Sequence, residues 1–216
     1  MDIFGFFLPV SVGVLAGIIG LLAFVPDILE MIYRDVKPNR ATWMVWAVLS
    51  VVLAASYYST GATESAWVPI VYAFGITVVA IFSLKYGERG WSALDTFCLL
   101  GAGVGLALWW ITNDPFLALY IAIVVDAIGA IPTLNKTYAR PRTESRTAWL
   151  MFLAAAGLNL FAIGEWTLSE ASYPVYLFLL SVVMVALLLR KPKEEKNAGK
   201  TLAKKENNKN KKKVNK

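Results

Sequence analysis

Long apolar segments alternate with short polar segments along most of this 216-residue chain. A helix rises 1.5 Å per residue, so about 20 apolar residues cross the roughly 30 Å of hydrocarbon in a bilayer. Seven segments come close to that length, each bounded by charge, proline or glycine: residues 5–26, 41–58, 66–84, 91–112, 115–134, 147–164 and 173–189. The pattern predicts an all-α polytopic membrane protein with seven transmembrane helices.

The composition agrees with contact with a lipid bilayer. Hydrophobic residues make up 57% of the chain and the mean hydropathy is +0.57, which is too apolar for an ordinary soluble domain. Cys98 is the single cysteine and histidine is absent, so the chain has no intrachain disulfide and lacks the residues of the usual metal sites. We therefore expect no metal and no cofactor.

The lysines and arginines before the C-terminal tail lie in alternate loops. They follow the first, third, fifth and seventh segments, whereas the loops after the second, fourth and sixth segments carry only acidic residues. Because cytoplasmic loops are enriched in Lys and Arg, this distribution predicts a multi-pass protein of the plasma (inner) membrane. Its N-terminus is outside and its C-terminus is cytoplasmic.

The formal net charge of +6 comes from a basic tail, residues 191–216. Eleven lysines and three glutamates give this tail a net charge of +8 and leave −2 on the rest of the chain. With few apolar residues, the tail is predicted to be disordered. It is either a solvated end that helps to set the orientation or a segment that contacts anionic lipid head groups. No aromatic residues interleave its charges, so we expect no nucleic-acid partner.

One charged passage occurs twice. PDILEMIYRDVKPNRATW (26–43) and PTLNKTYARPRTESRTAW (132–149) share four identities at an offset of 106 residues: Pro26 with Pro132, Arg34 with Arg140, Arg40 with Arg146, and Trp43 with Trp149. The match predicts an internal duplication. Residues 5–86 and 115–190 would each form a three-helix bundle, and a linker helix at 91–112 would keep the two copies parallel.

This layout resembles the PQ-loop and SWEET class of small-solute transporters, whose three-helix bundles are joined by an inversion helix. It is also similar to that of the nicotinamide riboside transporters. In PQ-loop proteins the first helix of each bundle ends in Pro-Gln, where this chain has Pro26-Asp27 and Pro132-Thr133. The stretch Lys37-Pro38-Asn39-Arg40 with Trp43 most closely resembles a group of uncharacterised bacterial membrane proteins. The resemblance implies a transporter of a small polar solute, sugar-like or vitamin-like, that works by alternating access between two pseudo-symmetric bundles.

Polar and aromatic residues inside the apolar segments are candidates for a substrate or ion pathway. Asp126 lies midway along its segment, where a charged carboxylate costs about 2.5–3.5 kcal/mol on an insertion scale, so we expect it to face the interior between the bundles. Asn159, Trp46, Tyr72 and Thr77 complete the candidate pathway. Asp126 either couples transport to protons or, when protonated, ties helices together through a residue such as Asn159 or Thr77.

Two prolines and several tryptophans have structural interpretations. Pro26 and Pro132 are either paired hinges or the points where apolar helices leave the bilayer, and Asp27 and Glu30 fit the second interpretation for the first copy. Tryptophans at segment ends predict an aromatic belt at the two membrane surfaces. These are Trp67, Trp110 and Trp166 outside, and Trp43, Trp91 and Trp149 inside.

Other functional classes compete with transport. An intramembrane aspartyl enzyme needs two carboxyls that share a proton, but the helical rise separates Asp95 and Asp126 by about 10 Å along the membrane normal. We therefore expect no enzyme activity. A structural or receptor-like membrane protein, which would lack a solvated central cavity, remains an alternative, and a homo-oligomer is compatible with the sequence.

Cysteine substitutions at Thr63 and Ser169 test the orientation. Both positions lie in loops without basic residues, so in a Cys98→Ser background an impermeant thiol reagent added to intact cells should label both cysteines. A cysteine at Lys37 should react only after the membrane is opened. Labelling of Thr63→Cys or Ser169→Cys from the cytoplasm alone would reverse the predicted topology.

Overall fold

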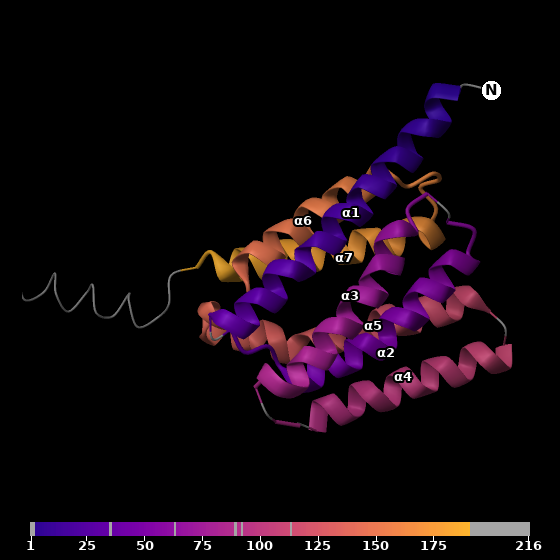
Figure 1. Ribbon diagram of the computed structural model, residues 1–216. Coiled ribbons are helices and arrows are strands. Elements are labelled where there is room, and N and C mark those ends of the chain that lie inside the picture. The colour runs from indigo at the N-terminus through magenta and orange to yellow at the C-terminus, as the bar shows by residue number, and fades with distance from the viewer. Residues whose placement is uncertain are drawn as a thin grey trace, which may run out of the picture.

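The computed structural model describes residues 3–34, 36–62, 64–88, 90–91, 93–112 and 114–190. In this part the chain is all-α, without strands, and Figure 1 shows its helices lying roughly along one direction. The elements are α1 (Ile3–Tyr33), α2 (Arg40–Ser59), α3 (Trp67–Tyr86), α4 (Ala93–Thr112), α5 (Pro115–Ala139), the 3-10 helix η1 (Pro141–Thr143), α6 (Arg146–Leu160) and α7 (Leu168–Leu188). The predicted disordered tail and the side chain of Asp95 lie outside what is described.

Five of these helices are long and apolar enough to cross a membrane: α1, α2, α3, α5 and α7. The expectation of an all-α protein with membrane-spanning helices is confirmed at this level, and the count of seven spans stays a prediction. α6 has only 15 residues, fewer than the about 20 that cross a bilayer. The predicted segment 147–164 included residues 161–164, which lie in the turn after α6.

Two helices continue beyond the predicted apolar segments. The segments ended at residues 26 and 134, whereas α1 ends at Tyr33 and α5 at Ala139. Pro26 and Pro132 therefore each lie inside a helix that continues for seven more residues. A proline removes one backbone hydrogen bond, and both helices accommodate that loss without ending.

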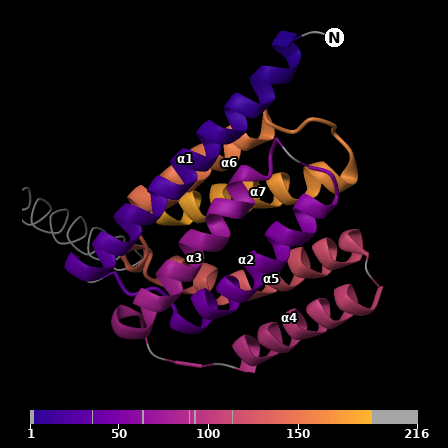
Figure 2. The ribbon, with the colours of Figure 1, turned by 45° about the vertical axis from the view of Figure 1, so that its right-hand side comes forward.

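Six helices form a closed ring. In order around the ring they are α1, α3, α2, α5, α7 and α6, and α6 packs against α1 to close it. α4 lies outside the ring against α5 and α2, as the two views in Figure 1 and Figure 2 show. The side chains that face the middle of this ring come from distant parts of the sequence.

Helix boundaries recur with one spacing at the end of the ring where α1 ends and α2 begins, here called the basic end because Lys85, Lys136 and Arg190 also lie at this end of their helices. α1 and α5 end 106 residues apart, and α2 and α6 begin 106 residues apart. Asn39 caps α2 by accepting a 3.1 Å hydrogen bond from the Thr42 amide, and Ser145 caps α6 by accepting a 3.1 Å bond from the Ala148 amide. Each cap satisfies an amide that the helix leaves unpaired.

Close contact between α1 and α3 depends on a glycine. The ring of Phe24 lies against Gly75, and a Cβ atom on Gly75 would come within 2.1 Å of that ring. Phe24 is 4% exposed and belongs to the core between the helices. The absence of a side chain at Gly75 therefore sets the position of Phe24.

Gly75→Ala should lower the free energy of unfolding by about 1–3 kcal/mol, because the added methyl group overpacks the contact with Phe24. Gly103→Ala in α4 is the matched control, since no atom lies within 4 Å of its Cβ position. Alanine there should be neutral or stabilising by up to about 1 kcal/mol, as expected for a helix interior. Unfolding of purified protein in detergent measures both changes, and equal stability of the two variants would contradict this packing.

Candidate functional site

A cavity of about 50 Å³ lies inside the ring of six helices. Roughly 10–15 Å³ of such space holds one water molecule, so the cavity has room for a few waters. Pockets for drug-sized ligands measure about 300–1,000 Å³, so a solute as large as a sugar requires the cavity to widen. All six helices of the ring line it: Phe24 from α1; Trp43, Trp46, Ser50 and Leu53 from α2; Tyr72 and Ile76 from α3; Asp126 from α5; Trp149 and Phe152 from α6; and Tyr173, Leu177, Leu180 and Ser181 from α7.

Aromatic rings form much of the cavity wall. Phe24, Tyr72 and Phe152 contact one another edge to face, with centroid distances of 4.8 to 5.7 Å. Trp43 contacts Trp46 in the same way at 5.4 Å. Such pairs are favourable beyond the area they bury, and the first three rings join α1, α3 and α6. The wall is thus a rigid aromatic surface shared by both halves of the chain.

Three hydrogen-bond donors in this wall have no partner among the described residues. They are Nε1 of Trp43, Nε1 of Trp46 and the hydroxyl of Tyr72, and all three side chains are buried. An indole N–H can only donate, and a buried donor without a partner costs about 1–3 kcal/mol. These residues therefore favour an acceptor atom supplied by water or by a ligand.

Asp126 supplies the acidic group of the cavity. It is 8% exposed, lines the cavity and accepts a hydrogen bond from the hydroxyl of Tyr176 on α7. Tyr176 also stacks on Tyr173, another cavity residue, with ring centroids 6.4 Å apart. The carboxyl group is thus held between α5 and α7 and faces the interior, as expected from its cost in hydrocarbon.

The five residues of the predicted pathway lie in different places. Asp126, Trp46 and Tyr72 line the cavity. Asn159 is 1% exposed but does not line the cavity, and neither atom of its amide group has a hydrogen-bond partner. Thr77 is exposed, and its hydroxyl donates to the Ala73 carbonyl one turn earlier at 2.7 Å. Neither Asn159 nor Thr77 bonds Asp126, whose partner is Tyr176; Thr77 is too far out because it faces away from the ring.

Two tryptophans that the sequence assigned to the membrane surface are buried instead. Trp43 is 2% and Trp149 is 6% exposed, and both line the cavity. Their assignment to an aromatic belt is a correction, because α2 and α6 turn these faces toward the ring. The other four tryptophans of the predicted belt are exposed: Trp67, Trp91, Trp110 and Trp166. The repeat match between Trp43 and Trp149 was the available signal for a shared internal role.

No group of three or more His, Cys, Asp or Glu residues in the described ranges is arranged to hold a metal ion. Comparison of the chain with protein-family models, with curated proteins and with solved structures finds no match in any of the three. The fold and the site together define an all-α protein with membrane-spanning helices around a buried aromatic cavity.

Tyr176→Phe should lower the free energy of unfolding by about 1–3 kcal/mol, because it leaves a buried carboxyl group without its hydrogen-bond donor. Tyr120→Phe on α5 is the control, since Tyr120 is exposed and does not line the cavity. Thermal or denaturant unfolding of purified protein gives both values. Equal stability of Tyr176→Phe and Tyr120→Phe would show that the Asp126 contact contributes nothing.

Proposed function

We propose that this protein is an integral membrane transporter that moves a small polar solute by alternating access between two pseudo-symmetric bundles. The main support is the composition of the cavity wall. Two lining pairs are 106 residues apart, Trp43 with Trp149 and Trp46 with Phe152. After one deleted residue in the second copy, two further lining pairs are 105 residues apart: Tyr72 with Leu177, and Ile76 with Ser181. A cavity shared in this way lies where a duplicated transporter binds its solute.

The helix contacts support the proposed bundles, residues 5–86 and 115–190, with 91–112 as linker. α3 packs between α1 and α2, and α7 packs between α5 and α6. Exchanging the two copies converts the α1 contact with α6 into the α5 contact with α2, and both contacts are present. Rocking of two such bundles about the cavity, with Pro26 and Pro132 as paired hinges, would expose it to one side at a time.

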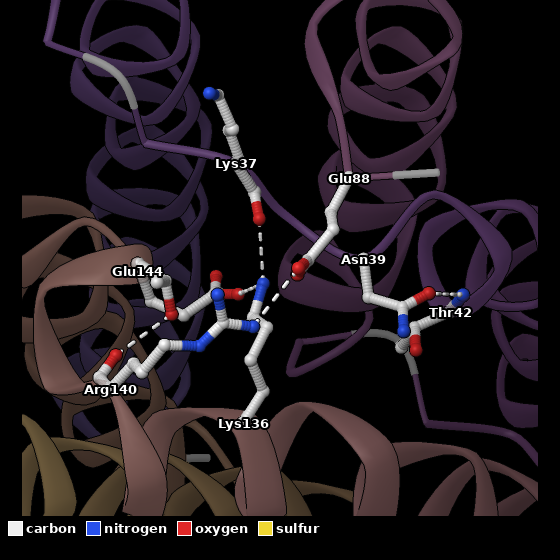
Figure 3. Close-up of polar contacts among 8 residues, drawn as sticks. Lys37, Asn39, Thr42, Glu88, Lys136, Arg140 and Glu144 are labelled. Carbon is white, nitrogen blue, oxygen red and sulfur yellow. Dashed lines mark hydrogen bonds and ion pairs between the residues drawn. The ribbon is translucent and has the colours of Figure 1, made fainter. Parts of the chain in front are cut away.

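Polar contacts join the two halves at both ends of the ring. At the basic end, Lys136 Nζ donates to the Lys37 carbonyl at 2.7 Å and Arg140 pairs with Glu88 at 2.9 Å (Figure 3). At the opposite end, the Tyr57 hydroxyl donates to the Glu170 carbonyl at 2.7 Å. Alternating access requires one set of contacts to break while the other holds. The charge distribution assigns the basic end to the cytoplasm.

The chemistry of the wall favours a particular kind of solute. Trp43, Trp46 and Tyr72 offer donors that need acceptor atoms, Asp126 accepts, and aromatic rings surround the space. A small ring compound with several oxygen or nitrogen acceptors and at least one donor matches this set. We therefore propose a sugar-like or vitamin-like solute, with lipid around the exposed apolar faces of the helices.

A ligand panel on purified protein tests this function. Sugars, vitamins and amino acids are added singly at millimolar concentration, and a true ligand at 100 times its Kd raises the free energy of unfolding by about 2.7 kcal/mol. Trp46→Ala should abolish the effect, whereas Trp110→Ala, at an 83% exposed position, should retain it. The ligand found is then tested for uptake into proteoliposomes. Binding without uptake would indicate a receptor-like protein, and no ligand at all would favour a structural one.

Asp126→Asn separates the two roles of this carboxyl group, because asparagine keeps neutral hydrogen bonding but cannot titrate. A proton-coupling role predicts retained stability and loss of the pH dependence of uptake. A purely structural role predicts that stability, uptake and its pH dependence are all retained.

A further inference from the structure

A group of three charged residues is buried near the basic end, between that end and the cavity. Asp27 on α1 is 1% exposed, Glu144 before α6 is 2% exposed, and Lys136 on α5 is 9% exposed. Lys136 Nζ lies 2.7 Å from Glu144 Oε1 and also donates to the Lys37 carbonyl at 2.7 Å (Figure 3). Asp27 follows the cavity residue Phe24 by three positions, about one helical turn.

The charges of this group do not balance at Asp27. Glu144 on the segment before α6 and Glu30 on α1 repel its carboxylate, while Lys136 on α5 attracts it. Lys136 is already engaged by Glu144 and by the Lys37 carbonyl. Neither carboxyl oxygen of Asp27 has a hydrogen-bond partner among the described residues.

A buried carboxylate without a partner is costly and is stabilised by neutralisation or by an added positive charge. Glu30 differs from Asp27 in this respect. It lies on the same helix one turn later, its side chain is 16% exposed, and it pairs with Arg34 at 3.9 Å. The unmet requirement for positive charge is therefore centred on Asp27.

We propose that Asp27 is a proton-binding site and that its proton controls the contact between Lys136 and the Lys37 carbonyl. The proton adds to a carboxyl oxygen and gives the neutral acid, and no other bond is made or broken. When Asp27 loses this proton, its negative charge competes with the Lys37 carbonyl for the Lys136 ammonium group. Because Lys37 follows α1 and Lys136 is on α5, the weakened contact loosens the basic end between the two halves.

The first experiment detects the proton without any transport assay. Infrared difference spectra of the full-length protein, recorded as the pH is raised, report the C=O stretch of protonated carboxyl groups. Asp27→Asn should remove a titrating band that Glu30→Gln and Asp126→Asn both retain. Glu144→Gln releases Lys136 to pair with Asp27, so Asp27 should then lose its proton at lower pH. An unchanged spectrum in Asp27→Asn, or a band removed by Na⁺ at constant pH, would overturn the proton site.

The second experiment measures the contact itself. Ser181 lines the cavity, so Ser181→Cys in a Cys98→Ser background reports access of a water-soluble thiol reagent from the basic side. Labelling rates with Asp27 and with Asp27→Asn are compared at each pH, and their ratio cancels ionisation of the thiol. One proton should change the ratio by up to about tenfold per pH unit. Lys136→Met should label rapidly at every pH.

A constant rate ratio would show that the proton on Asp27 does not control access. These outcomes are separate from the proposed transport function. A protein that transports without an Asp27 band would contradict only the proton site. A protein that shows the band and the pH-dependent ratio but moves no solute would contradict only transport.

Discussion

The seam between α1 and α6 closes the ring of helices, and the cavity exists only because the ring is closed. Small residues line this seam: Ala16, Ala23, Ala155 and Ala156 are each at most 1% exposed. A Cβ atom on Gly20 would lie 3.6 Å from the Cβ of Ala155, and one on Gly13 would lie 3.3 Å from that of Ala162. Helices in lipid associate through close packing of small residues rather than through the hydrophobic effect. The amino-terminal helix thus joins the second half of the chain.

Polar groups that are buried behind this seam determine what the interior can bind. Water in the hydrocarbon layer cannot satisfy them, so each needs a partner inside the protein or a ligand. Asp126 has such a partner in Tyr176, whereas the indole N–H groups of Trp43 and Trp46 and the carboxyl group of Asp27 have none among the described residues. The unmet donors surround the cavity and the unmet carboxyl lies one turn away. This separation distinguishes a solute site from a proton site.

Local sequence features were sufficient for part of this description. Apolar segments of sufficient length predict membrane-spanning helices, and a carboxylate in the middle of one segment marked Asp126 as interior. Trp46 and Tyr72 were identified because they lie deep in their segments, and both line the cavity. Asn159 and Thr77 have the same polarity in sequence, but one lies outside the cavity wall and the other faces outward.

The sequence by itself determined the helical, membrane-spanning character of the protein, because hydropathy and helix length depend on neighbouring residues alone. Only the tertiary structure decided which faces turn inward. Trp43 at the start of an apolar segment is compatible with a membrane surface or with a cavity, and packing of the ring places it in the cavity. Asp27 after a proline is compatible with a helix end, yet α1 continues to Tyr33 and buries it beside residues more than 100 positions away. Burial depends on which distant helices approach, and that is a property of the closed ring.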